Sequence, residues 1–349
     1  MALGEVCGAW TALVTPFKAD GAIDWEEFER NVAFQIEQGI TGLLPTGTTG
    51  ESPTLGWEEH NEVIERTIEL ARGKVFVIAG TGSNSTAEAL AATRHAAHVG
   101  ADGALLVDCY YNGPSSLELR TEYHGHIAKQ VPELLIVPYV IPGRTGCALS
   151  PEDLAVLAYE CPNVKAVKEA TGDLERMART RQLCPEQFSI VSGDDNITYQ
   201  MMTDPRIRAS GVISVISNLT PGPIERMTRA VREGRLTEAK QLADALEPLF
   251  NIVTVSVENS RWVPGVGEVK VKDKFRNPLG IKALMGALGI LKGGCRRPLG
   301  KMTTPGLRVL RTAITKVWQT NPDILQPTAK FYGIDLEARL RDDRNWECT

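Results

Sequence analysis

The sequence lacks the features that mark several large classes of protein. Its seven cysteines are an odd number and include no C-x-x-C pair, which indicates neither a disulfide framework nor a zinc site. The start, MALGEVCGAW, has no basic segment before a long apolar core, so no signal peptide is expected. A run of about 18 apolar residues is also missing, which argues against a transmembrane helix. We therefore expect a cytoplasmic protein.

Signals for nucleic acids, metals and cofactors are equally scarce. The net charge is −5 and the basic residues are spread along the chain, which argues against a nucleic-acid partner. Gly80 and Gly82 are not followed by the third glycine of a dinucleotide-binding loop. His124 and His126 are two residues apart on an expected helix, so they point to different faces. No metal and no cofactor is predicted.

Apolar runs of strand length alternate with amphipathic helical patterns up to about residue 235. The strand-like runs are 9–17, 42–46, 75–80, 104–109, 134–141, 164–170, 189–193 and 212–217. These runs are nearly continuous in Val, Ile, Leu and Ala, which is typical of a parallel sheet covered on both faces. Eight such units without a reversal predict an α/β fold, a closed (β/α)8 TIM barrel over residues 1–235.

Beyond residue 235 this alternation stops. Helical periodicity returns at 236–249, 281–291 and 307–319. Residues 260–274 look like an exposed loop or hairpin, and 321–349 are polar. We expect 236–349 to form a C-terminal helical extension for packing or assembly, and the sequence assigns no role to 260–274 or 321–349.

Two lysines in the run 164–170 raise the first chemical hypothesis. Successive strand residues point to opposite faces, so Lys165 and Lys168 cannot share one, and Lys168 lies at the carboxyl end. Burial lowers the pKa of an ammonium group, and a lysine that is neutral near pH 7 forms Schiff bases with carbonyl carbons. The alternative is that both lysines are ordinary residues at the rim of a strand.

Active groups of such barrels lie at the carboxyl ends of strands and on the following loops. After the second run, glycines flank Thr48 and Thr49, so backbone N–H groups can converge on a carboxylate, although a simple tight turn is also compatible. At the end of the fifth run, Tyr139 can exchange a proton and Arg144 can bind a carboxylate through two hydrogen bonds. With Lys168, this set is typical of carbonyl chemistry on a small keto acid.

Six motifs occur in the order and spacing of one family. They are GTTGES (47–52), YYN (110–112), PGRTG (142–146), KEATG (168–172), SGDD (192–195) and GVISV (211–215). Over roughly residues 8–235 the chain resembles the dihydrodipicolinate synthase and N-acetylneuraminate lyase family of pyruvate-dependent lyases. The resemblance implies a Schiff-base enzyme that joins pyruvate to an aldehyde without a cofactor.

The resemblance also implies a role for each catalytic residue. Lys168 would condense with the ketone of pyruvate, and Tyr139 would act as acid and base. Thr48 would link Tyr139 to Tyr111, which would reach in from a neighbouring subunit. A shared Tyr111 requires at least a dimer, and the family likeness suggests a tetramer. On the residues alone, paired tyrosines are more readily explained by packing.

Substrate-binding roles follow from the same resemblance. Thr49, together with Thr48, would hold the pyruvate carboxylate, and Gly193 and Ile213 would place backbone carbonyls near the lysine. Arg144 would bind the carboxylate of aspartate 4-semialdehyde, giving 4-hydroxy-tetrahydrodipicolinate for lysine biosynthesis. The alternative is a pyruvate-dependent aldolase acting on a 2-keto-3-deoxy sugar acid, whose sugar-derived aldehyde does not require that arginine.

A second group of residues resembles the family's allosteric lysine site at a subunit interface, which implies L-lysine as an effector. This group consists of Ser52, Trp57, His60, Asn84, Glu88 and Tyr110. The alternative is that Trp57 and His60 merely cover the second helix.

The chain also departs from the family pattern. Cys109 stands where proline is usual, and Pro138 and Val140 replace an aliphatic residue and an asparagine around Tyr139. The carboxyl-terminal region is longer than usual, chiefly around 260–274 and after 320.

Overall fold

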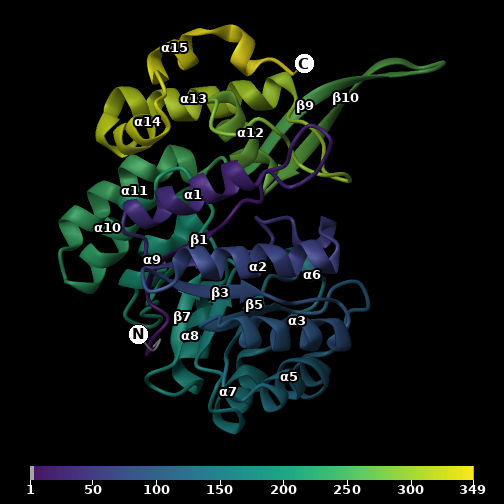
Figure 1. Ribbon diagram of the computed structural model, residues 1–349, viewed down its shortest axis with the longest axis vertical. Coiled ribbons are helices and arrows are strands. Elements are labelled where there is room, and N and C mark those ends of the chain that lie inside the picture. The colour runs from purple at the N-terminus through teal and green to yellow at the C-terminus, as the bar shows by residue number, and fades with distance from the viewer. Residues whose placement is uncertain (1–3, 349) are drawn as a thin grey trace.

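Eight parallel strands form a closed barrel in which neighbours in the chain are neighbours in the sheet and β1 pairs with β8 (Figure 1). The structure, a computed structural model, describes residues 4–348. The strands are β1 Gly8–Ala12, β2 Gly42–Leu44, β3 Phe76–Gly80, β4 Gly103–Val107, β5 Leu135–Val140, β6 Ala166–Glu169, β7 Ser189–Ser192 and β8 Gly211–Ser214. Each overlaps one expected run, and the (β/α)8 prediction is confirmed.

Both faces of the strands are buried, which explains why the sequence shows no polar alternation. Along β5, Val137 and Tyr139 belong to the cluster inside the barrel, whereas Ile136 and Val140 pack outward against the helices. Along β6, Ala166 points inward and Val167 outward. Lys168 therefore points inward by the two-residue period of a strand.

Helices surround the barrel (Figure 1). They are α1 Trp25–Glu37, α2 Trp57–Ala71, α3 Thr86–Val99, α4 Ser116–Glu118, α5 Gly125–Gln130, α6 Pro142–Thr145, α7 Pro151–Glu160, α8 Leu174–Leu183, α9 Thr198–Thr203 and α10 Pro221–Arg232. The side chains of Asp24, Ser85, Ser150 and Asp173 accept hydrogen bonds from backbone N–H groups of the first turns, which fixes where α1, α3, α7 and α8 begin.

The C-terminal extension consists of helices and one hairpin. Its elements are α11 Leu236–Phe250, β9 Thr254–Val263, β10 Gly267–Arg276, α12 Leu279–Ala287, α13 Thr304–Thr320, α14 Gln326–Tyr332 and α15 Leu336–Arg341. The polar tail is folded, because Leu325, Leu336 and Trp346 are buried in the cluster that also contains Phe28 of α1. Among the helices of residues 4–348, none is long and apolar enough to cross a membrane.

Candidate active site

A cavity of about 230 Å³ opens at the carboxyl end of the barrel. It is lined by residues within and after β2, β3, β4 and β5: Thr46, Gly47, Thr48, Ser52, Pro53, Gly80, Gly82, Leu105, Val107, Tyr110, Tyr139, Arg144 and Thr145. The segments that carry Thr48, Tyr110, Tyr139 and Arg144 therefore converge, and the cavity is large enough for a small keto acid.

Lys168 and Tyr139 are neighbours on adjacent strands. They are paired in register on β6 and β5. Lys168 is 5% exposed and Tyr139 4%, and the Lys168 Nζ atom lies 4.2 Å from the centroid of the Tyr139 ring. The amine thus points into the barrel directly beside a phenol that lines the cavity.

Burial changes the ionisation of Lys168. Desolvation lowers the pKa of its ammonium group from 10.5 to about 8, although the carboxylates of Asp194 and Asp195 work in the opposite direction. The positive charge of Arg144 lowers the pKa of Lys168 further. A lysine with a pKa of about 8 has about one tenth of its molecules as free amine at pH 7, against far less than a hundredth for an exposed lysine, and the free amine is the form that attacks a carbonyl.

This pKa predicts the pH dependence of the first half-reaction. Only the free amine reacts, so kcat/KM for pyruvate should rise about tenfold per pH unit on the acid side and level off above about pH 8. Initial rates between about pH 6 and pH 10 would measure this profile. A limb that levels off only above pH 10 would show that the reacting lysine is not desolvated.

The phenol of Tyr139 is held in its protonated form. Desolvation raises its pKa to about 12, and a hydrogen bond with the Thr48 side chain opposes that rise. The phenol is therefore a proton donor before substrate binds, and the charged iminium of a substrate adduct would make it a better acid still. This arrangement supports an acid–base role for Tyr139 and a relay through Thr48.

Gly193 fits its place because it has no side chain. A Cβ atom there would lie 3.1 Å from Lys168 Cε and 2.7 Å from Ala170 Cβ, so a larger residue would displace the lysine. Ile213, on β8, is fully buried inside the barrel. That both residues offer carbonyls to the reacting centre stays a prediction.

Residues from the C-terminal extension support the loop after β2. Asn277 Nδ2 donates to Thr49 Oγ1 over 2.9 Å, across 228 positions of sequence. The Lys282 ammonium group donates to Glu51 Oε1 over 2.5 Å, and both side chains are buried. The Thr49 hydroxyl accepts the hydrogen bond from Asn277 and keeps its own O–H. That Thr48 and Thr49 hold the pyruvate carboxylate therefore stays a prediction. No sequence signal pointed to Asn277 or Lys282, which lie outside the βα repeat.

Arg144 lies at the mouth of the cavity on α6. Its Nη2 donates to the carbonyl of Asn277 over 2.8 Å, which fixes the guanidinium beside the entrance. Thr145 Oγ1 donates to the carbonyl of Ile141 over 3.1 Å and so ties α6 to the end of β5. The guanidinium retains further N–H groups that can meet a carboxylate entering the cavity.

Tyr111 lies outside the cavity of its own chain. Its side chain is 92% exposed, and its φ angle of +77° is rare for a residue other than glycine. The preceding Tyr110 lines the cavity instead. The structure thus separates the two tyrosines, and that Tyr111 completes the site of a neighbouring subunit stays a prediction.

The residues of the expected effector site differ in their surroundings: Ser52 and Tyr110 line the cavity, and the Asn84 backbone and Glu88 interact with Tyr110. Trp57 is 40% exposed and packs edge-on against His60, with ring centroids 5.0 Å apart. His60 is 1% exposed, and desolvation lowers its pKa to about 4. Glu88 accepts a hydrogen bond from Ser83 Oγ over 2.6 Å. His60 therefore packs against the Trp57 ring and is uncharged at neutral pH, so it has no charge with which to bind an effector.

The departures from the family pattern leave the cavity's polar groups in place. Val140 is fully buried in the outward-facing cluster, so its side chain points away from the site. Pro138 alternates with Tyr139 along β5 and therefore also lies on the outer side. Cys109 is buried in the same outer cluster, with its pKa raised to about 12 by desolvation, so its thiol is inert at neutral pH.

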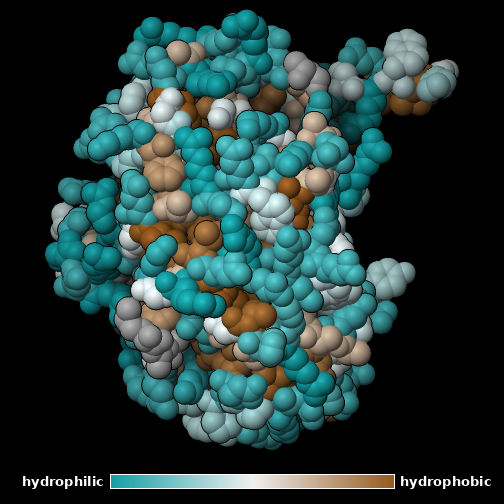
Figure 2. All heavy atoms as spheres, viewed as in Figure 1, coloured by the Kyte–Doolittle hydropathy of each residue, from teal (hydrophilic) through white to brown (hydrophobic). Residues whose placement is uncertain are grey.

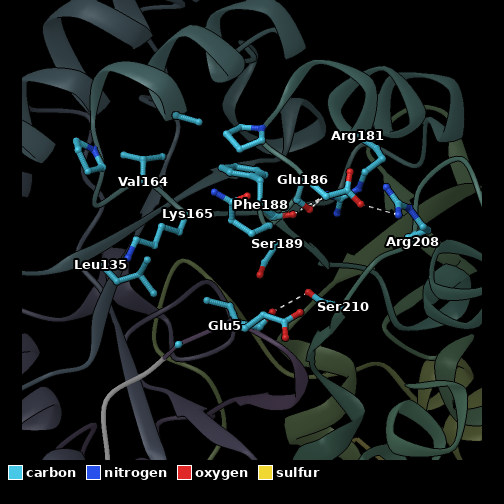
Figure 3. Close-up of a pocket in the computed structure, with 16 residues that line it drawn as sticks. Glu5, Leu135, Val164, Lys165, Arg181, Glu186, Phe188, Ser189, Arg208 and Ser210 are labelled. Carbon is cyan, nitrogen blue, oxygen red and sulfur yellow. Dashed lines mark hydrogen bonds and ion pairs between the residues drawn. The ribbon is translucent and has the colours of Figure 1, made fainter. Parts of the chain in front are cut away.

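Lys165 lies at the opposite end of the barrel. It is exposed and lies next to Leu135 and Val164 in a cavity of about 680 Å³, which Arg181, Glu186 and Arg208 line on the other side (Figure 3). The cavity lies among the residues that precede β5 to β8, which is the amino-terminal end of the strands, where such barrels do not carry catalysis. The two lysines thus face different environments, and Lys168 alone has the chemistry expected of a nucleophile.

Comparisons with known proteins agree with this geometry. The model of the dihydrodipicolinate synthetase family matches residues 5–317. A 4-hydroxy-tetrahydrodipicolinate synthase of Syntrophus aciditrophicus is 41% identical over 296 residues, which cover 85% of this chain and 93% of that protein.

Solved structures give the same result. The 4-hydroxy-tetrahydrodipicolinate synthase of Methylacidiphilum fumariolicum superposes with a TM-score of 0.82 at 35% identity, covering 93% of this chain and 99% of that one. A dihydrodipicolinate synthase of Cyanidioschyzon merolae, solved with lysine bound, gives a TM-score of 0.79 at 36% identity, covering 89% and 98% of the two chains.

Proposed function

The chain belongs to the dihydrodipicolinate synthetase family, and on this basis we propose that Lys168 is its Schiff-base nucleophile and Tyr139 its acid and base. The activity is that of the family's synthases: the enzyme condenses pyruvate with aspartate 4-semialdehyde to 4-hydroxy-tetrahydrodipicolinate, a step of lysine biosynthesis. The observation that supports our assignment most directly is the desolvated Lys168 amine 4.2 Å from the Tyr139 ring.

In the first half-reaction, the free amine of Lys168 adds to the ketone carbon of pyruvate. The phenol of Tyr139 gives a proton to the departing hydroxyl, and water leaves as the iminium forms. The backbone N–H groups around Thr48 hold the pyruvate carboxylate. The positively charged iminium withdraws electrons, so the methyl group gives a proton to the Tyr139 phenolate left by the loss of water, and an enamine results.

In the second half-reaction, the enamine carbon attacks the aldehyde carbon of aspartate 4-semialdehyde. The new alkoxide takes a proton from Tyr139, and the semialdehyde's ammonium group gives a proton to the resulting phenolate. The free amine so formed then attacks the iminium carbon. Ring closure expels Lys168 as the free amine. Arg144 orients the semialdehyde by binding its carboxylate through paired hydrogen bonds.

A panel of aldehydes tests this assignment. Purified enzyme with pyruvate should consume pyruvate rapidly with aspartate 4-semialdehyde and slowly with sugar-derived aldehydes such as glyceraldehyde. Residual pyruvate is measured with lactate dehydrogenase. Preference for a sugar-derived aldehyde would overturn the proposal in favour of a 2-keto-3-deoxy sugar acid aldolase.

Changing Arg144 should separate the two half-reactions. A hydrogen bond to a charged group contributes about 1.5–3 kcal/mol, so Arg144→Gln should lower kcat/KM for the semialdehyde roughly 10- to 100-fold. Arg144→Lys keeps the charge and loses the paired hydrogen bonds, so its kcat/KM for the semialdehyde should lie between those of the wild type and Arg144→Gln. The rate at which pyruvate and borohydride modify Lys168 should change little, and an equal loss in both half-reactions would contradict this role.

We also propose that L-lysine binds the group around Trp57 and inhibits the enzyme. The lysine-bound structure from Cyanidioschyzon merolae supports this, as does Glu88, whose carboxylate can pair with an ammonium group. Millimolar L-lysine should lower the rate, and Glu88→Gln should weaken inhibition roughly tenfold without changing the rate in its absence. Full activity of the wild type at millimolar lysine would refute the proposal.

A homo-oligomer, at least a dimer, completes the proposed site. The exposed and conformationally unusual Tyr111 supports this, because an aromatic ring that is 92% exposed gains by insertion into a neighbouring subunit. Sedimentation of the purified protein would give its assembly state, and a monomer with full activity would exclude a shared tyrosine.

A further inference from the structure

The hairpin β9–β10 is an extended arm. Its strands have ten residues each and pair antiparallel over their whole length. It projects beyond the rest of the molecule (Figure 1), and Figure 2 shows apolar side chains at its tip, where Trp262 is 76% and Val266 73% exposed. This is the segment to which the sequence assigned no role.

One face of the arm is basic. Lys270, Lys272, Lys274 and Arg276 alternate along β10, so their side chains share a face, and all four are exposed. Within residues 4–348 the structure gives the three lysines no ion pair. The acidic residues of this face are Glu258, which is opposite Lys272, and Glu268. With four positive and two negative side chains, the face has a net charge of +2, whereas the net charge of the whole chain is −5.

The other face of the arm is electrically balanced. Arg261 Nη2 lies 2.7 Å from Asp273 Oδ1, and Asn259 Nδ2 donates to the same carboxylate. The remaining positions of β10 on this face are Val269, Val271 and Phe275. The positive charge of the arm is therefore confined to the lysine face.

The row of basic residues ends at the mouth of the active site. Arg276 Nη1 donates to the carbonyl of Gly143 over 2.6 Å, directly beside Arg144. Desolvation is the main cause that lowers the pKa of Arg144, and the positive charge of Arg276 adds to it. At about 3.4 Å per residue, Lys274 stands about 7 Å and Lys270 about 20 Å from Arg276 along the strand.

We propose that the basic face of β10 concentrates pyruvate at the mouth of the barrel. This rests on the function proposed above. Pyruvate is an anion of charge −1 at neutral pH, whereas aspartate 4-semialdehyde carries an ammonium group and a carboxylate and has no net charge. A positive field at the entrance raises the local concentration of an anion and leaves that of a neutral zwitterion nearly unchanged. The arm thus acts on one substrate of the reaction and not on the other.

Ionic strength provides the first test. Raising salt from about 10 mM to about 300 mM shortens the screening length from about 30 Å to well below 10 Å. For the wild type, kcat/KM for pyruvate should then fall roughly three- to tenfold, with kcat unchanged, while kcat/KM for the semialdehyde changes less than about twofold. Chloride and acetate salts should give the same curve if screening is the cause.

Charge-neutral variants provide the second test. Lys270→Gln/Lys272→Gln/Lys274→Gln should bring the low-salt kcat/KM for pyruvate down to the high-salt value of the wild type and flatten its salt dependence. Single variants should follow distance: Lys274→Gln should lose more than Lys270→Gln, because the field decays with separation. The semialdehyde parameters should remain those of the wild type.

A matched variant separates the position of the charges from their number. Lys74, Lys129 and Lys165 are exposed at the amino-terminal end of the barrel, so replacing all three with glutamine changes the net charge equally, far from the mouth. That variant should keep the wild-type salt dependence. If both triple variants behave alike, or if the β10 variant behaves as the wild type, the proposal fails.

Failure of this inference is distinguishable from failure of the proposed function. If Lys168 were not the nucleophile, pyruvate and borohydride would not modify it at any ionic strength. If the arm is instead covered by a second copy of the chain, the β10 triple variant changes the sedimentation of the protein, and that result would also overturn the steering role.

Discussion

Replacing Lys168 with alanine is expected to abolish turnover, with a loss of about a thousandfold or more, because no other group can form the iminium that stabilises the enamine. Pyruvate with borohydride should add one three-carbon unit to the wild type and none to Lys168→Ala. Mass spectrometry of the intact chain measures both. Lys165→Ala is the matched control, since Lys165 lies just before the same strand but is exposed at the other end of the barrel.

Lys168 should also lower the free energy of unfolding of the protein. Its pKa is about 8 in the folded chain and 10.5 for an exposed lysine, so the protonated form destabilises the fold below about pH 8. This cost fades as the pH rises from about 8 towards 10.5. Lys168→Met, which fills the space without a charge, should stabilise the chain by up to about 3 kcal/mol at pH 7.

Thermal melts of Lys168→Met against the wild type would show this effect as a higher melting temperature at pH 7 that shrinks at pH 10. Labelling of Lys168→Ala equal to that of the wild type would refute the nucleophile. A Lys168→Met variant that melts lower than the wild type at pH 7 would show that the amine is well solvated or paired in the fold.

Tyr139→Phe is expected to slow turnover roughly 10²- to 10⁴-fold, the range for loss of a general acid–base group. The phenylalanine keeps the ring beside Lys168 and removes the phenol that Thr48 contacts. Schiff-base formation should still occur on long incubation, so borohydride should still trap pyruvate. The step that fails is proton transfer, and exchange of the pyruvate methyl protons with deuterated water, followed by proton NMR, should nearly cease.

Tyr123→Phe is the control for removing a buried phenol. Tyr123 is 2% exposed and its hydroxyl accepts a hydrogen bond from the Ser83 backbone N–H, outside the barrel interior. Its loss should lower stability by about 1 kcal/mol and leave methyl exchange intact. Methyl exchange at the wild-type rate in Tyr139→Phe would show that another group moves the proton.

Features that depend on local sequence were predictable. The eight strands were found because burial on both faces makes each one a continuous apolar run. The inward direction of Lys168 followed from the two-residue period of a strand and the position of Lys165. The helical segment after β4 contains a π-helical stretch, Leu119–His124, which apolar periodicity does not reveal.

Features that depend on contacts between distant parts of the chain were not predictable. Asn277 supports Thr49 and Lys282 supports Glu51 from more than 200 residues away, and nothing in either local sequence signals the other partner. The burial of His60 against Trp57 could not be predicted either. A helical pattern shows which residues share a face but not how deeply each of them is buried.

The order of residues alone was enough to establish a barrel with a lysine, a tyrosine and an arginine at the carboxyl ends of its strands, because strand periodicity and loop position are local properties. That Lys168 and Tyr139 are neighbours in register became visible only in the folded chain, since pairing depends on how the barrel closes. Folding also turned residues 260–274 from an unassigned segment into part of a charged arm at the mouth, because the contact of Arg276 with Gly143 joins segments 133 positions apart.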